Sequence, residues 1–210
     1  YERRKAVAEV LEGSDTVFYE DDAFGELFFD ARPRRPVKSL VPGQCILSGS
    51  FSKIIAPGMR IGWICAPAEI LSQFNCAKQA ADLHSNFLCQ KVLSRYLETC
   101  DLDGHVRRIS AAYGQNCRLM CDLLDDMFPA GMAHTQPEGG MFLLATLPEG
   151  LDSMRVFEEG LKGGVAVLPG TPFYVSGGGE STIRLNFSSM DDERIKEGMG
   201  RLARVVRALV

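Results

Sequence analysis

The sequence predicts an α/β protein whose first half contributes to a mostly parallel sheet and whose second half is α+β. Short apolar runs at residues 16–20, 44–48 and 61–66 alternate with helical patterns at residues 1–12 and after Pro67. Apolar runs without polar alternation are typical of strands that are covered on both faces. Strands that alternate with helices favour a parallel sheet in the first half.

The composition limits the class of protein. The chain has 210 residues, of which 46% are hydrophobic and 24% charged, as in an ordinary globular protein. Lysine and arginine number 23 against 27 acidic residues, which gives a net charge of −4. No basic field therefore predicts a nucleic-acid or anionic-membrane partner. No apolar run reaches the roughly 18 residues expected of a membrane-spanning helix.

The cysteines predict a reducing environment. They number seven, are scattered and form no CxxC pair, whereas a disulfide framework normally uses an even set in a short secreted chain. We therefore expect reduced thiols, mostly in the core of a cytoplasmic protein. The three histidines lack metal-ligand spacing, so no metal site is expected.

Helical spacing dominates the middle of the chain. The segment after Pro67 predicts one long or broken helix to about Glu98, and a second helix runs from residue 105 to Pro129. Trp63 is expected in the core. The remaining sequence predicts strands at 133–136, 141–146, 165–168 and 182–187, a helix at 153–162, and a last helix that begins at Ser188 or Ser189 with Asp191 and Asp192.

Two domains are predicted. Thr99, Asp101, Asp103 and Gly104 cluster between helical patterns, which favours a boundary near residues 99–105. We expect one domain over residues 1–100 and another over 101–210. The chain begins with Tyr1 inside a helical pattern, so we expect it to be a piece of a longer protein.

The segment that carries chemistry is SGSFSKIIAPGMRIG, residues 48–62. Small hydroxyl residues surround Lys53 directly after an apolar strand, and strand ends are where α/β proteins place ligands. Serine hydroxyls and the Arg60 fork suit a phosphate, and Lys53 is either a phosphate clamp or an amine nucleophile. The Walker pattern is absent. An ordinary polar loop with a solvated lysine remains open on these residues alone.

The pattern SFSKxxAPGxRxGW resembles the lysine signature of pyridoxal-phosphate-dependent aminotransferases of fold type I. The branch it resembles contains aminoadipate and kynurenine aminotransferases and the effector domains of MocR-type regulators. Four further segments resemble the same family in the same order along the chain. They are EDDAFGELFF (20–29), GGMF (139–142), VAVLPGTPFY (165–174) and IRLNFS (183–188).

The resemblance implies roles for the residues around the lysine. Lys53 corresponds to the residue that forms a Schiff base with the cofactor aldehyde and shuttles a proton. Asp21 corresponds to the acid that pairs with the pyridine nitrogen, whereas Asp22 should face the other way on an extended strand. Phe24 lies where the family usually has a tyrosine, so the hydroxyl donor to the cofactor's phenolic oxygen is missing.

The remaining implied roles concern anion binding. Ser50, Ser52 and Arg60 match the positions that bind the cofactor phosphate. Arg184 matches the residue that binds the substrate carboxylate, and alternation places it on one strand face with Asn186.

The resemblance therefore implies an aminotransferase with pyridoxal 5'-phosphate as cofactor and amino and 2-oxo acids as substrates. Its members are usually homodimers. It also implies that cofactor contacts preceding the acidic motif lie outside this chain, so the piece alone should bind cofactor weakly. Two alternatives remain open, an effector domain of a MocR-type transcriptional regulator and another fold-type I chemistry such as a carbon–sulfur lyase.

Overall fold

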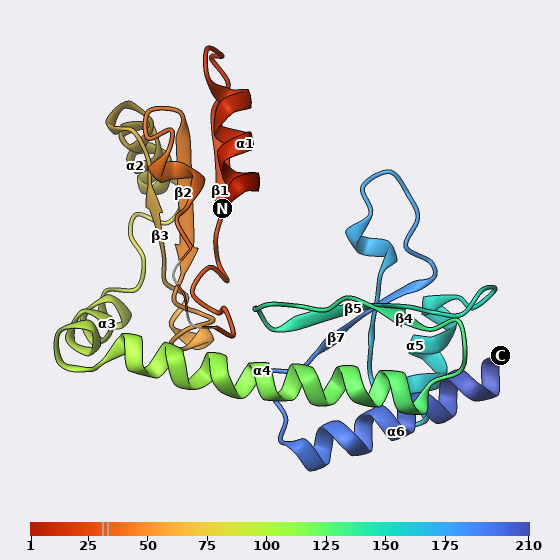
Figure 1. Ribbon diagram of the computed structural model, residues 1–210. Helices are drawn as coiled ribbons and strands as arrows, with labels where there is room; N and C mark the ends of the chain where they lie inside the picture. The colour runs from red at the N-terminus through yellow and green to blue at the C-terminus, as the bar shows by residue number, and fades with distance from the viewer. Residues whose placement is uncertain (31, 33) are drawn as a thin grey trace. The chain divides into compact units, whose positions relative to one another are not determined.

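The chain forms two compact units, Tyr1–Arg108 and Ile109–Val210, and the division falls within helix α4 (Leu102–Met127; Figure 1). The structure is a computed structural model that describes residues 1–30, 32 and 34–210. That residues 1–100 and 101–210 are the two functional domains stays a prediction.

The first unit contains a three-stranded mixed sheet. Helix α1 (Glu2–Leu11) precedes strand β1 (Phe18–Asp21), and strands β2 (Cys45–Ser50) and β3 (Gly62–Cys65) follow. The strand order is β1-β2-β3, with β1 and β2 parallel and β2 and β3 antiparallel. The predicted strands are thus confirmed in position, and these three strands form one parallel and one antiparallel pair.

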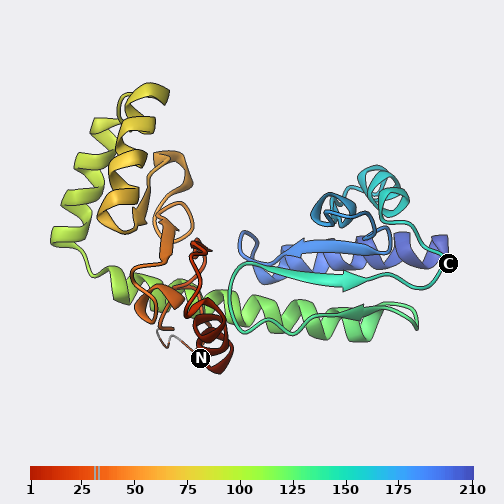
Figure 2. The ribbon, with the colours of Figure 1, turned by 90° about the horizontal axis from the view of Figure 1, so that it is seen from above.

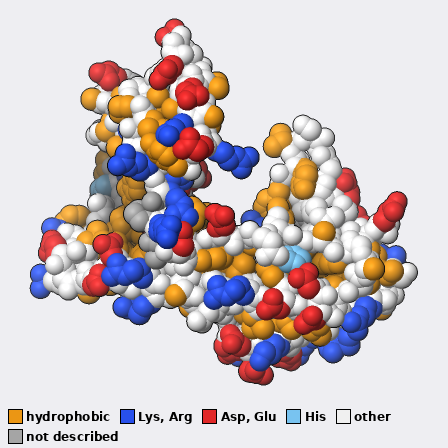
Figure 3. All heavy atoms as spheres, viewed as in Figure 1, with side chains coloured by type: hydrophobic (Ala, Val, Ile, Leu, Met, Phe, Trp, Pro, Cys, Tyr) orange, Lys and Arg blue, Asp and Glu red, His pale blue; other side chains and the backbone are white. Residues whose placement is uncertain are grey.

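The antiparallel pairing follows from the connection between the strands. Residues 51–61 join β2 to β3 and contain only the short 3₁₀ turn η2 (Pro57–Met59). A parallel crossover needs about a dozen or more residues, usually including a helix, so this connection turns the chain back as a hairpin. All residues of β3 are exposed, so the expectation that the run at 61–66 is covered on both faces is wrong for Gly62–Cys65, whereas Ile61 is buried. Apolar side chains reach the surface of this unit (Figure 3).

The long helical pattern after Pro67 is broken into α2 (Ala68–Ala81) and α3 (Phe87–Thr99). Leu83 adopts a left-handed conformation (φ 63°) between them, which ends the first helix. Asn86 then caps the second helix, its side-chain oxygen accepting a hydrogen bond from Cys89 N at 3.0 Å.

The polar cluster around residue 101 begins helix α4. The Asp101 carboxylate accepts a hydrogen bond from Gly104 N at 2.8 Å, and the helix starts at Leu102, three residues earlier than residue 105. A Cβ on Gly104 would lie 2.2 Å from the Asp101 carboxylate, so the glycine permits the close cap. These residues therefore carry a helix-start signal.

The second unit is α+β. Its sheet has the order β4-β5-β7-β6 and is antiparallel throughout its described pairs. Asp191, rather than Ser188 or Ser189, caps the last helix by accepting from Arg194 N at 2.9 Å. The elements are β4 (Ala133–His134), β5 (Phe142–Thr146), α5 (Ser153–Lys162), β6 (Leu168–Pro169), β7 (Thr182–Asn186) and α6 (Asp192–Leu209).

One face of this sheet forms the core with the helices. Leu143 of β5 and Ile183 and Leu185 of β7 are buried, and they alternate with more exposed residues. Helix α6 presents Met199 and Leu202 as buried residues, and α4 and α6 lie along the same side of β5 and β7 (Figures 1 and 2). Burial of each such side chain stabilises the fold by about 1.5–3 kcal/mol. The opposite strand face is left for other contacts.

The cysteines are less buried than the sequence predicts. Cys45, Cys117 and Cys121 are buried, whereas Cys65, Cys76 and Cys100 are exposed; all seven, Cys89 included, are free thiols. Burial raises the pKa of the Cys45 thiol to about 11, and burial raises that of Cys117 to about 12. Among the described residues, no helix is long and apolar enough to cross a membrane.

Glu20 ties the sheet to the loop that follows it. Its carboxylate, on β1, accepts hydrogen bonds from Val37 N at 3.0 Å and Lys38 N at 3.1 Å, at the start of turn η1 (Val37–Ser39). Lys38 Nζ in turn donates to the carbonyls of Pro42 and Cys45. These bonds fix the segment that leads into β2.

We expect Glu20→Gln to lower the free energy of unfolding by about 1–3 kcal/mol, because an amide cannot accept both backbone bonds as a carboxylate does. Urea unfolding measures the change. Glu9→Gln is the matched control, since Glu9 lies exposed on α1. Equal effects of the two substitutions would contradict the prediction.

Candidate functional site

The candidate site in the first unit lies where two parallel strands end. Asp21 is the last residue of β1 and Ser50 the last of β2. The register pairs Asp21 with Ser48, so both strands finish at the same edge of the sheet. The carboxyl edge of parallel strands is where α/β proteins bind ligands. The structure therefore brings the acidic motif and the lysine motif to one edge of the sheet.

Ser50, Ser52 and Arg60 form a contiguous polar group beyond β2. Ser52 N donates to Ser50 Oγ at 3.1 Å, and Arg60 Nη1 donates to Ser52 Oγ at 3.4 Å. In the part of the chain that the structure describes, neither serine hydroxyl donates to an acceptor. Two hydroxyl protons and the Nε–H and Nη2–H groups of Arg60 thus remain available for an anion.

Arg60, a member of this polar group, has a strained backbone conformation. Arg60 has φ 56° and ψ 39°, a left-handed conformation that is unusual for a residue other than glycine. The conformation follows turn η2, and Arg60 Nη1 also donates to Pro57 O at 3.1 Å. Such strain concentrates at functional sites. Here it turns the arginine back toward Ser52.

Lys53 projects toward the acidic loop. Its Nζ lies 5.9 Å from the centre of the Phe24 ring, so the two motifs meet through these side chains. The lysine is half-buried. Within residues 1–30, 32 and 34–210, no carboxylate or carbonyl forms a hydrogen bond or ion pair with its amine. The amine is therefore held near the site without a protein acid to occupy it.

Asp21 and Asp22 point to opposite faces of the strand, as predicted. Asp21 shares its face with Tyr19 and Ser48, and Tyr19 Oη donates to Ser48 Oγ at 2.9 Å. This hydroxyl pair was not predicted; the two-residue spacing of Tyr19 and Asp21 was the available signal. Asp21 is exposed at the strand end.

Asp22 lies on the other face with Trp63 and Glu26, in a cavity of about 460 Å³. Burial raises the pKa of both carboxyls; nearby Arg4 lowers that of Asp22, and the charge of Asp22 raises that of Glu26. Trp63 is 36% exposed, so its expected place in the core is wrong. Its ring instead lies on Gly49, where a Cβ would approach the ring to 2.3 Å.

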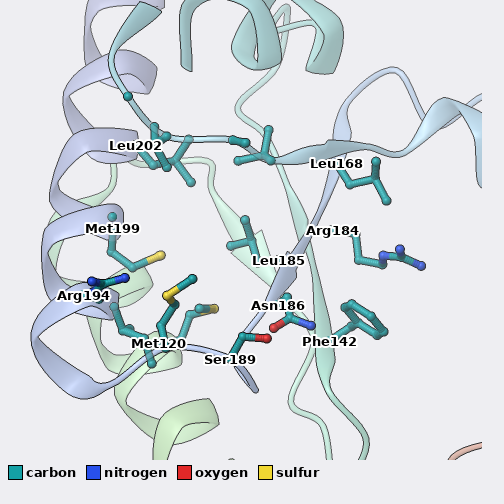
Figure 4. Close-up of a pocket in the computed structure, with 17 residues that line it drawn as sticks. Met120, Phe142, Leu168, Arg184, Leu185, Asn186, Ser189, Arg194, Met199 and Leu202 are labelled. Carbon is teal, nitrogen blue, oxygen red and sulfur yellow. The ribbon is translucent and has the colours of Figure 1, made fainter. Parts of the chain in front are cut away.

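Arg184 is placed by the sheet of the second unit. It lies on β7 between Leu144 of β5 and Leu168 of β6, on the face opposite the core. Its guanidinium carbon lies 4.2 Å from the centre of the Phe142 ring and 4.4 Å from that of Phe173. Figure 4 shows Arg184 and Phe142 extending on one side of the strand and Leu185 on the other. Asn186 is exposed beside the buried Leu185, as the predicted alternation along β7 requires.

Two cavities border Arg184. One of about 510 Å³ is lined by apolar and aromatic side chains, with Thr135, Tyr174 and Arg184. The other, of about 630 Å³, extends to Arg194 and the apolar residues of α6 (Figure 4). Phe142 and Phe173 lie in the segments GGMF and VAVLPGTPFY, but no role was predicted for either ring. A ring diagonal to Arg184 on the neighbouring strand was the signal for Phe142.

Comparison with known proteins identifies the family. The sequence profile of aminotransferase classes I and II matches residues 2–202. The chain belongs to this family. It is 39% identical over 206 residues to aromatic-amino-acid aminotransferase 1 of Thermococcus litoralis, covering 98% of this chain and 49% of that protein. The chain thus spans about half the length of the curated relatives it matches.

Solved structures agree with this membership. The α-aminoadipate aminotransferase LysN of Thermus thermophilus, in complex with N-(5'-phosphopyridoxyl)-L-leucine, matches with a TM-score of 0.95 and 35% identity, covering 100% of this chain and 55% of that one. The predicted fold class is confirmed. The transcriptional regulator NorG of Staphylococcus aureus is also similar, at 30% identity over 98% of this chain and 46% of that protein. The lower identity does not favour the regulator alternative.

We expect Asp22→Asn to stabilise the protein at pH 7. A carboxyl whose pKa rises on folding stabilises the fold below its ordinary value of 3.8, and this contribution is lost as the pH rises through the raised pKa. The ionised carboxylate therefore opposes folding at neutral pH. Removing it should add on the order of 0.5 kcal/mol, a figure reduced for solvent screening of a half-buried group.

Urea unfolding at pH 7 and pH 3 measures this effect. The gain should disappear at pH 3, where Asp22 is protonated. Asp15→Asn, at an exposed position of the same unit, is the control. A gain of the same size at both pH values would show that the charge of Asp22 is not its cause.

Proposed function

We propose that this chain forms part of a pyridoxal-phosphate-dependent aminotransferase, which moves an amino group between an amino acid and a 2-oxo acid. The observation that carries the proposal is the group at the ends of β1 and β2. There an unpaired lysine amine stands beside a Ser50–Ser52–Arg60 anion site, with Asp21 at the adjacent strand end. Membership in the aminotransferase family supports the same reaction.

The residues present fit this cofactor. Free serine hydroxyls and a guanidinium suit a phosphate ester, and an amine suits an aldehyde. A carboxylate at Asp21 suits a protonated pyridine nitrogen. When bound, pyridoxal 5'-phosphate supplies a ring that withdraws electrons from the substrate Cα.

Each side chain then has a specific task. Lys53 would hold the cofactor through its amine and carry a proton to and from the substrate Cα. Asp21 would keep the ring nitrogen protonated. Ser50, Ser52 and Arg60 would bind the phosphate. Phe24 cannot donate a hydrogen bond to the phenolic oxygen as a tyrosine does, although its ring lies near Lys53 Nζ.

Arg184 would bind the substrate carboxylate. Among the described residues that line the cavity of about 510 Å³, it is the one that is ionised; the other walls include Phe142, Leu144 and Phe173. A cation in apolar surroundings binds a carboxylate more strongly than one in water, because the surroundings screen the charge less. The planar guanidinium also matches a planar carboxylate.

The wider setting follows from the family and the thiols. We infer a homodimer as the working assembly, as is usual in the family that the motifs resemble. We also infer a cytoplasmic location, because all seven cysteines are free and reduced thiols are typical of that compartment.

The decisive test adds pyridoxal 5'-phosphate to the protein that carries this chain, records the visible spectrum, and then reduces with borohydride before peptide mapping. We expect an absorbing adduct that is fixed on the peptide containing Lys53. Lys53→Ala should abolish it. Lys78→Ala should retain it, because Lys78 is exposed on α2 and pairs with Asp82.

Two outcomes would count against the proposal. If the Lys53→Ala protein formed the adduct in equal yield, the reactive amine would belong to another residue. If the adduct formed on Lys53 but no amino group passed from any amino acid to a 2-oxo acid, the cofactor site would be supported. The proposed reaction would then be wrong.

A further inference from the structure

We propose that Phe142 and Phe173 together position the guanidinium of Arg184, so that its N–H groups stay free for the substrate carboxylate. The inference rests on the proposed function, in which Arg184 binds that carboxylate. Phe142 and Phe173 are positioning residues, since they act through Arg184.

Phe142 reaches Arg184 from the neighbouring strand. Arg184 pairs with Leu144 and Asn186 pairs with Phe142, so Phe142 is a diagonal neighbour of Arg184 on the same sheet face. The guanidinium carbon lies 4.2 Å from the ring centre. That distance is well within the roughly 6 Å over which an aromatic ring attracts a cation. This contact is built into the register of β5 and β7.

Phe173 reaches the same guanidinium from a loop. It ends the 3₁₀ turn η3 (Thr171–Phe173), and its ring centre lies 4.4 Å from the guanidinium carbon. Two hydrogen bonds anchor this loop to β7: Gly170 N donates to Thr182 O at 2.7 Å, and the Thr182 hydroxyl donates from Oγ1 to Gly179 O at 2.9 Å. The second ring is therefore held by a separate segment of the chain.

The two rings hold the cation without using its hydrogen-bond donors. A ring face attracts a guanidinium through its π electrons, which leaves the five N–H groups of the fork unbonded. In the described part of the chain, no acceptor bonds to the Arg184 side chain and no carboxylate pairs with it. An acidic positioning residue would compete with the substrate for the same fork; aromatic rings do not.

The immediate surroundings agree with this arrangement. Phe142, Phe173 and Arg184 all line the cavity of about 510 Å³, so the fork borders a space that a ligand can enter. Its walls, as far as the described residues form them, carry no acidic residue. A carboxylate entering this cavity meets one cation, already oriented by two rings.

The experiment uses the complete protein loaded with pyridoxal 5'-phosphate and compares two probes, L-leucine and L-leucinamide, which differ only in the carboxylate. Dissociation constants come from titration of the visible spectrum, and kcat and KM from amino transfer. The variants are Phe142→Leu, Phe173→Leu, the tyrosine substitution at each position, and Arg184→Lys. Val175→Ala is the matched control, because Val175 is fully exposed in the same loop as Phe173.

We expect each leucine variant to raise the dissociation constant for L-leucine about 3- to 30-fold, the range that a cation–π contact supplies. Binding of L-leucinamide should change less than about twofold, and KM should change more than kcat. The tyrosine variants keep a ring and should bind L-leucine nearly as the unchanged protein does. Val175→Ala should have no effect.

The possible failures are distinguishable. If Arg184→Lys weakens L-leucine binding and both leucine variants leave it unchanged, Arg184 binds the carboxylate and the positioning role is wrong. If Arg184→Lys has no effect, the proposed carboxylate site itself is wrong. Equal weakening of both probes would mean a general structural defect and would also overturn the inference. Phe173 is 46% exposed, so its replacement tests the idea even if Phe142→Leu does not fold.

Discussion

The parallel register of β1 and β2 is the constraint on which the first unit depends. Because Asp21 stands opposite Ser48, the acidic motif and the lysine motif end at one edge of the sheet although a long loop separates them in sequence. Glu20 supports this register by fixing the intervening loop through backbone bonds. The proposed anion site also depends on the tight connection after β2, where Arg60 has a left-handed backbone and its side chain donates a hydrogen bond to Ser52 Oγ.

Charged side chains at the proposed site have different partners from charged side chains elsewhere in the chain. Several lysines and arginines on the helices pair with acids one turn away, as Lys78 does with Asp82. Lys53 and Arg184 instead contact aromatic rings, and within the described residues they form no ion pair. An aromatic contact retains the charge and the donors for a ligand. In each unit, the cation proposed to bind a ligand, Lys53 or Arg184, forms no ion pair with an acidic residue among the described residues.

Much of the fold was predictable because local signals and tertiary contacts agree. Helix α5 has its predicted bounds of 153–162, and Ile183 and Leu185 alternate with Arg184 as a half-buried strand requires. Two of the failures share one cause. The run at 61–66 and Trp63 were expected to be covered because they are apolar, and periodicity reports the character of a face without reporting what lies against it.

Residue types, their order and their spacing were sufficient to indicate the aminotransferase family, the lysine and the residues proposed to bind an anion. Tertiary structure alone decided the antiparallel return of β3, the exposure of Trp63 and the meeting of Phe142 and Phe173 on Arg184. The physical reason is that each of these depends on contacts between segments distant in sequence. Strand register and loop closure set such contacts, and neither is encoded in local spacing.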